Sequence, residues 1–197
     1  MCIYVYPTGV YYTPCVSRAE HELRNTMRLL WEQHVHWTRA AINGIITDSP
    51  DLDAVLARLL RNAPDMGDSL KPFYGEQVGE QYSALIKDHL TIAAELVTAA
   101  KEGDTQSFEA IDKRWYANAD EIATFLSSIN PYISQQVMRE MMHEHLDLFK
   151  QEAVFILQKD YESAIKKFDE VEMQALHMAD YISEAIIKQF PQIQHQM

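Results

Sequence analysis

The sequence is poor in the residues on which disulfide-rich, strand-rich and nucleic-acid-binding proteins depend. It has only two cysteines, Cys2 and Cys15, which are too few for a disulfide framework. Six glycines and seven prolines in 197 residues favour helices over a protein built from strands and turns. Lysine and arginine number 17 against 29 aspartates and glutamates, and the formal net charge is −12. Because no basic stripe is visible, we expect no nucleic-acid partner.

Long apolar runs are also missing. No stretch approaches the roughly 18 uncharged apolar residues that a membrane-spanning helix needs. The first residues lack the basic segment and apolar run of a signal peptide. The acidic charge also disfavours attraction to an anionic membrane surface. We therefore expect no membrane association and a cytoplasmic location.

Hydrophobic residues are plentiful, at 47% of the chain, which is ample for the core of one domain of this length. We expect a bundle domain over residues 17–191, preceded by an arm over 1–16 and followed by a polar tail over 192–197. Tyrosines in the arm alternate with valine and threonine, and prolines interrupt them. Two interpretations of the arm stay open. It is either a mobile or strand-like segment lying on the bundle, or else an oligomer contact or a tyrosine and cysteine cross-linking tail. The expected assembly is a homodimer or small homo-oligomer.

Apolar residues recur every three or four positions along the rest of the chain, which is the pattern of amphipathic helices. The pattern predicts helices from 17 to about 44–48, 49–61, about 76–102, 104–129, 134 to about 159, and about 160–190, with residues 62–65 breaking the second. One long bent helix in place of the last two stays open. Short connections make sequence neighbours antiparallel. We predict an all-α, antiparallel up-and-down bundle of five to six helices, with ferritin- or hemerythrin-like architecture and a short N-terminal arm.

A short pattern around a histidine occurs three times. It reads LWEQHVHW at 30–37, LIKDHLTI at 85–92 and MMHEHLDL at 141–148. His34, His89 and His145 each fall on the apolar stripe of a helix, near its midpoint. Since the midpoints of antiparallel helices lie at one level, the pattern predicts a polar layer across the centre of the bundle. Further polar members of the stripes are Asn118, Glu152 and Glu172.

Such a layer restricts the chemistry of the core. A buried polar group without a partner costs roughly 1–3 kcal/mol, so the layer must be a hydrogen-bonded network, a wet pocket or a metal site. Helical bundles build metal sites from side chains on different helices, and imidazole with carboxylate suits transition metals such as Fe, Zn or Mn. The leading hypothesis is a metal-binding bundle with a redox or storage role, and the sequence leaves open whether it is an enzyme. The predicted metal ligands are His34, His89, His145, Glu172 and Glu152, and the Asn118 amide would orient a ligand or a bound water.

Known metal-site motifs are largely missing. The Glu-x-x-His pair of ferritin-like sites occurs once, at 140–143, and His143 points away from the stripe of His145. The residues four positions after the three histidines are Thr38, Ala93 and Phe149, so the hemerythrin pairing is absent. Two alternatives therefore stay open. One is a non-catalytic structural or interaction protein whose polar layer sets helix register, and the other is a bundle that binds a small molecule in a central pocket.

Four segments carry a resemblance to known sequences. They are LWEQHV at 30–35, RLLRN at 58–62, WYANADEIA at 115–123 and INPY at 129–132. Together they resemble an uncharacterised family of helical-bundle proteins from spore-forming Gram-positive bacteria, over about residues 23–191. The resemblance implies the bundle fold and no particular activity.

Overall fold

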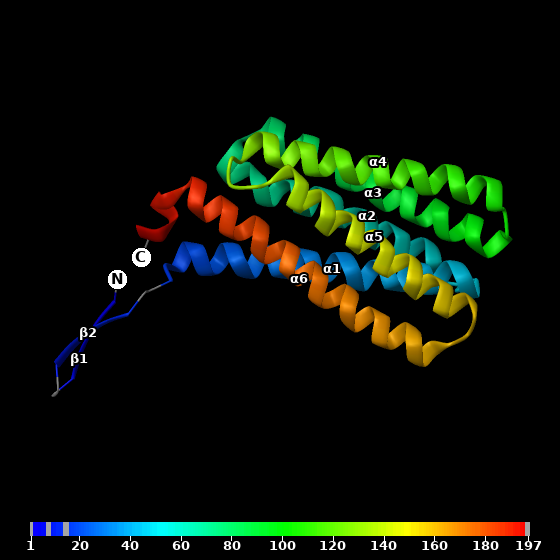
Figure 1. The fold of residues 1–197 in the computed structure, drawn as a ribbon, viewed down its shortest axis with the longest axis horizontal. Helices are drawn as coiled ribbons and strands as arrows, with labels where there is room; N and C mark the ends of the chain where they lie inside the picture. Colours follow the sequence, from blue (N-terminus) through cyan, green and yellow to red (C-terminus); the bar gives the residue numbers. More distant parts are fainter. Residues whose placement is uncertain (1, 7–8, 14–15, 196–197) are drawn as a thin grey trace.

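The computed structural model describes residues 2–6, 9–13 and 16–195, with side chains described over 16–193. Six long helices make up nearly all of the part that it describes (Figure 1). They are α1 (Arg18–Thr47), α2 (Leu52–Tyr74), α3 (Glu76–Glu102), α4 (Thr105–Ile129), α5 (Gln135–Leu157) and α6 (Tyr161–Gln189). The predicted all-α bundle of five to six helices is confirmed.

The helices alternate in direction along a shared axis (Figure 1). Each packs against the next in sequence, α6 returns to α1, and α1 also contacts α3 and α5. Because neighbours are antiparallel, α1, α3 and α5 run in the same direction. Residues at matching positions of these three helices therefore lie at one level of the bundle.

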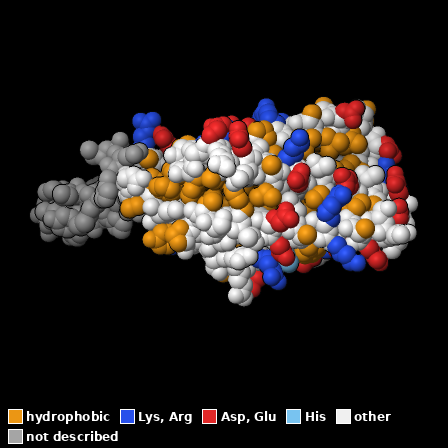
Figure 2. All heavy atoms as spheres, turned by 90° about the horizontal axis from the view of Figure 1, so that it is seen from above, with side chains coloured by type: hydrophobic (Ala, Val, Ile, Leu, Met, Phe, Trp, Pro, Cys, Tyr) orange, Lys and Arg blue, Asp and Glu red, His pale blue; other side chains and the backbone are white. Residues whose placement is uncertain are grey.

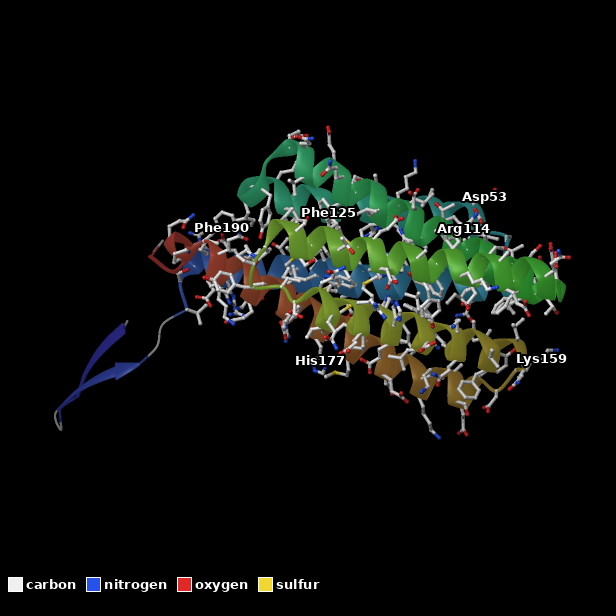
Figure 3. The ribbon with its side chains drawn as sticks, turned by 45° about the horizontal axis from the view of Figure 1, so that its top comes forward. Asp53, Arg114, Phe125, Lys159, His177 and Phe190 are labelled. Carbon is white, nitrogen blue, oxygen red and sulfur yellow. The ribbon has the colours of Figure 1, made fainter. Side chains whose placement is uncertain are left out.

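Local signals in the sequence mark most helix ends correctly. The Ser17 hydroxyl accepts from the backbone N–H of Glu20 at 3.0 Å and so caps the start of α1. The Asp104 carboxylate and the Ser134 hydroxyl cap α4 and α5 in the same way. Helices α5 and α6 are separate, and the turn between them places Lys159 in the left-handed region at a φ of 61°. Figure 3 shows Lys159 at this turn, at the opposite end of the bundle from Phe190.

The predicted break at residues 62–65 is wrong, because α2 continues through Pro64 and Pro72. Proline inside a helix loses a hydrogen bond and crowds the preceding turn. Tertiary packing outweighs that cost here, since Asn62 and Ala63 are fully buried. A Cβ built on Gly67 would lie 2.4 Å from the backbone oxygen of Gly79 in α3, so two glycines let the helices approach closely. Proline signals a helix break within one turn of its own helix, whereas the packing that keeps α2 continuous involves residues of other helices.

The chain begins with two short strands. β1 (Cys2–Tyr6) pairs antiparallel with β2 (Gly9–Thr13), in a register that places Tyr4 opposite Tyr11. The arm therefore contains strands, and its predicted placement on the bundle stays a prediction. The predicted tyrosine and cysteine contacts concern side chains that lie outside the described residues, as do Pro7, Pro14 and Cys15.

A short helix near the C-terminus contacts the start of α1, and the surface mixes charged and apolar side chains. Residues Pro191–His195 form a short 3₁₀ helix, η1, in which the Ile193 carbonyl accepts a 2.5 Å hydrogen bond from the Ser17 hydroxyl. Acidic and basic side chains are interspersed with apolar ones on the face seen in Figure 2. Among the described helices, none has the length and apolar composition that crossing a membrane would take.

Candidate metal centre

The three histidines of the repeated pattern converge at the centre of the bundle. Their ring centroids lie 5.4, 6.1 and 6.3 Å apart. His34 and His89 are each 2% exposed and His145 is fully buried. A nitrogen of each ring lies within 4.8 Å of a nitrogen of the other two. The bundle therefore holds a buried group that is able to bind a metal ion.

Helix direction explains the convergence. His34 lies on α1, His89 on α3 and His145 on α5, the three helices that run in parallel. Each histidine is near the middle of its helix and on its buried face. Equal height and a shared inward direction bring three imidazoles to one point, although about 55 residues of chain separate successive rings.

Each histidine is held by a side-chain amide from the following helix. The Nδ1 atom of His34 lies 3.1 Å from Oδ1 of Asn62 on α2. His89 and Asn118 on α4 repeat this contact at 2.8 Å, and His145 and Gln174 on α6 at 3.0 Å. The amide follows its histidine by 28, 29 and 29 residues. The bundle is thus three helical hairpins, each contributing the same polar pair.

The amides also determine which ring nitrogen carries hydrogen. Each amide nitrogen donates to the backbone carbonyl four residues before the paired histidine, at Leu30 (3.0 Å), Leu85 (3.1 Å) and Met141 (2.7 Å). A carbonyl can only accept, so the amide oxygen must be the atom that faces Nδ1. Nδ1 therefore donates in all three rings, and Nε2 carries a free lone pair.

The free lone pairs face one another. The Nε2 atoms of His34 and His145 are 3.4 Å apart, and with hydrogen on both Nδ1 atoms neither can donate to the other. Two nitrogens each about 2.05 Å from a tetrahedral zinc ion would be about 3.3 Å apart. The spacing of this pair is thus that of two ligands of one ion, whereas two unshared acceptors in an apolar core are unfavourable. The ligand nitrogen of His89 lies within 4.8 Å of the other two.

Burial keeps the rings neutral. It lowers the pKa of His34 to about 4, against a smaller opposing effect of the hydrogen bond with Asn62. Burial and then the neighbouring His34 lower the pKa of His89 to about 3. The pKa of His145 is also far below its usual value, first through burial and then through His34 and His89. All three rings are uncharged near pH 7, which is the form that binds metals.

Aromatic side chains surround the three rings. Trp31 meets His34 edge to face at a centroid distance of 5.4 Å and His145 at 6.1 Å. Trp115 lies 5.4 Å from His89, and Phe149 lies 4.9 Å from His145. Such surroundings exclude water and strengthen any electrostatic interaction at the centre.

The predicted ligand Glu152 has a different neighbour. It is fully buried on α5, two turns beyond His145, and its Oε1 lies 2.9 Å from Nη1 of Arg39 on α1. The N–H bond does not point at the oxygen, so the contact is an ion pair without a well-aligned hydrogen bond. Burial raises the pKa of Glu152 to about 7, and Arg39 acts against that shift.

Glu172, the other predicted carboxylate ligand, is half-buried on α6 beside Glu32 of α1. Burial, followed by the hydrogen bond and negative charge of Glu172, raises the pKa of Glu32. Among the described side chains, the one group of at least three histidines, cysteines or carboxylates with converging ligand atoms is His34, His89 and His145. The structure therefore brings the three histidines together with Asn118. It places Glu152 beside Arg39 and Glu172 beside Glu32 instead.

Sequence reasoning missed Asn62 and Gln174. Both occupy the place that Asn118 has in the middle hairpin, and the three amides follow one another at intervals of about 56 residues. The repeated histidine pattern has nearly the same period. A search for polar residues at a constant distance after each histidine could have found them.

Comparisons of the chain with models of protein families, with curated proteins and with solved structures each returned no match. The family resemblance drawn from the four sequence segments stays a prediction. What the three histidines do is therefore inferred from their geometry and chemistry.

Proposed function

We propose that the protein binds one transition-metal ion between the Nε2 atoms of His34, His89 and His145. The observation that carries the proposal is the orientation of these atoms. Three amides hold hydrogen on Nδ1, which leaves the Nε2 lone pair of each ring free, and one ligand nitrogen of each ring lies within 4.8 Å of the other two. Hydrogen bonds from the far side of a ligating imidazole are a regular feature of metal sites, where they orient the ring and raise its basicity.

The ligand set favours some metals over others. Imidazole nitrogen suits zinc, copper, iron and nickel, whereas manganese prefers oxygen ligands. Glu152 lies beside Arg39 and Glu172 beside Glu32, so neither carboxylate belongs to the converging group. The three ligands that remain are neutral imidazoles. A divalent ion would then keep its full charge in an apolar core, which is costly unless hydroxide or another anion joins it. Zinc with bound hydroxide, iron with an anion, or monovalent copper meets this condition.

Three protein ligands leave a coordination position for an exchangeable group. Catalytic zinc sites use this arrangement, whereas structural sites close all four positions with protein ligands. One three-histidine group among the described side chains also suits a redox or catalytic role better than bulk metal storage. The proposed role is thus a metal centre with an open position.

Metal content of protein purified without added metal tests the proposal most directly. We expect about one equivalent of metal, with cobalt(II) restoring stoichiometric binding after chelation and giving the intense visible bands of a tetrahedral site. His89→Gln should abolish binding, because it removes one of three ligands at similar side-chain size. His143→Gln is the matched control, since His143 is partly exposed and bonds to Asp120 at the surface. Absence of metal and of cobalt binding in a folded wild-type protein would overturn the proposal.

A second candidate function is supported by the repeated hydrogen bonds themselves. Each histidine and amide pair joins two helices of one hairpin and fits only one register. The layer could therefore act as a device that sets helix register in a non-catalytic protein. In that case chelators would leave the melting temperature unchanged, while His89→Gln and Asn118→Leu would lower it without any effect on metal content.

A further inference from the structure

A second feature lies next to the histidine layer and has no part in the proposal above. An apolar cavity of about 60 Å³ lies among α1, α3, α4 and α5, with Leu59 of α2 also in its lining, one helical turn from the three rings. Its lining includes Thr38, Ala93 and Phe149, the residues four positions after His34, His89 and His145. Side chains of a helix lean toward its N-terminus, so these three lean back toward the histidine layer.

The opposite side of the layer is closed. The residues three positions before the histidines are Trp31, Ile86 and Met142, each at most 2% exposed. They are large and fill the space between the same three helices. The layer is therefore sealed toward the N-terminal ends of α1, α3 and α5 and bordered by open space on the other side. Any exchangeable ligand of the proposed metal would lie on that other side.

The cavity offers few partners to a polar occupant, the Trp115 Nε1 donor being the buried one in its lining without a hydrogen bond. Most of its lining is aliphatic or aromatic. The Thr38 hydroxyl donates to the His34 carbonyl at 2.7 Å, and the Lys150 amine pairs with Asp112 and Asp147. A buried water needs two to four polar partners, whereas apolar cavities of proteins stay dry and accept xenon or benzene.

The cavity also has contact with the outside. Val154 on α5 belongs to its lining and is 47% exposed. Its inner end is formed by Trp115 and Phe149, which are the side chains packed against His89 and His145. A single apolar space thus extends from the surface near Val154 to the residues that touch the imidazoles.

From these observations we infer that the cavity is a binding site for a small, uncharged, apolar molecule of about the size of dioxygen. The site holds this molecule about one helical turn from the metal, on the open side of the histidine layer. Binding in the cavity needs no metal and breaks no bond. Only the use of the bound molecule as a metal ligand rests on the proposed function. The inference names the class of ligand that the open coordination position would receive in a metal that needs no bound anion there, such as monovalent copper.

Xenon binding to the metal-free protein tests the inference separately from the metal. Xenon is added to the full chain, and the shifts of methyl signals are followed by NMR. Saturable shifts are expected for the cavity methyl groups of Ala41, Ile42, Leu59 and Val97. Ala93→Leu should remove these shifts, because the added carbons fill the cavity. Ala110→Leu adds the same atoms on the exposed side of α4 and is the matched control.

The possible outcomes separate the two proposals. Saturable wild-type shifts that Ala93→Leu removes and Ala110→Leu keeps would support the cavity site, whatever cobalt does. Shifts that do not saturate, or that persist in folded Ala93→Leu, would overturn it even if the metal site is real. If cobalt fails to bind while xenon titrates as expected, the metal proposal fails and the apolar site stands.

Discussion

The histidine layer and the Arg39–Glu152 pair are two ways of burying polar groups in one bundle. His145 and Glu152 both lie on α5 and both are fully buried. The histidines are neutral, and each shares a hydrogen-bonded amide and carbonyl with its own hairpin. Glu152 instead has one cation, at a distance of 2.9 Å and with poor alignment. The first arrangement satisfies all but one atom of each ring, and the second leaves most of a carboxylate unsatisfied.

The comparison shows how burial acts on groups of opposite charge type. Removal from water disfavours the charged form, so it lowers the pKa of the histidines and raises that of Glu152. The amides leave the histidines neutral, while Arg39 pulls Glu152 back toward ionisation. Neutrality at the layer suits a metal cation, and the charge at Glu152 is already balanced by Arg39.

The largest expected effect comes from removing the cation of the pair. Arg39→Met leaves Glu152 buried without a counter-charge, and breaking a buried pair costs about 3–5 kcal/mol. We expect this loss at pH 8 and a smaller one at pH 5.5, where the carboxyl group is protonated. Denaturant unfolding at both pH values measures it. The double variant Arg39→Met/Glu152→Gln should recover much of the loss. If Arg39→Met were as stable as the wild type at pH 8, Arg39 would not be needed to balance the charge of Glu152.

Acidification should destabilise the metal-free protein through the histidine layer. Unfolded histidines bind protons below pH 6.5, whereas the buried rings do so only near pH 4 or below. Their stabilising effect is therefore fully present above pH 6.5 and is lost as the pH falls. Glu152 acts in the opposite direction, because its folded pKa of about 7 lies above its unfolded value.

The net difference near pH 5 is about two protons, or roughly 2.7 kcal/mol per pH unit. Unfolding free energies measured between pH 7 and pH 4.5 test this slope. Replacing all three histidines with glutamine should abolish the loss on acidification. A wild-type free energy that stays constant over this range would contradict the assigned neutrality of the rings.

Removing one amide should weaken metal binding without removing a ligand. Asn118→Leu takes away the hydrogen bond that orients His89, and such changes lower metal affinity about 10- to 100-fold, or about 1.4–2.7 kcal/mol. Competition titration with cobalt measures the change. Asn43→Leu is the control, since Asn43 makes the same amide-to-carbonyl bond, to Arg39, without a histidine. Equal affinities of Asn118→Leu and wild type would show that the amides only support the fold.

The smallest effect is expected at the partly exposed carboxylate pair. Glu32→Gln removes repulsion with Glu172, so stability at pH 7 should rise by no more than about 1 kcal/mol, since solvent weakens such interactions. Glu172→Gln should leave metal affinity unchanged, because Glu172 has Glu32 as its neighbour. Thermal unfolding and cobalt titration measure the two effects. A large loss of cobalt affinity in Glu172→Gln would restore this glutamate as a ligand.

Local chemistry explains what could be predicted. Capping residues such as Ser17, Asp104 and Ser134 act within one turn, so the sequence alone places their helix starts. The failure at Pro64 has the opposite cause, because the continuity of α2 depends on packing against α1 and α3. Proline is read correctly as a helix breaker only where tertiary contacts do not compensate.

In the candidate site, too, local patterns were predictable from the sequence and contacts between helices were not. His34, His89 and His145 were identifiable because each repeats a local pattern on a buried helix face. Glu152 shares the face of His145, yet its position along α5 places it beside Arg39. Helix periodicity specifies the face of a residue, whereas the partner at each height depends on a different helix.

The sequence by itself determined a bundle of five to six amphipathic helices, most of the helix ends and the central height of the three histidines, because periodicity and capping are local properties. Only the tertiary structure decided that Asn62 and Gln174 complete the layer and that an amide oxygen faces Nδ1 of each histidine. It also decided that open space lies on one side of the rings. These features depend on how parallel and antiparallel helices align in space, and such alignment arises from contacts between residues far apart in the chain.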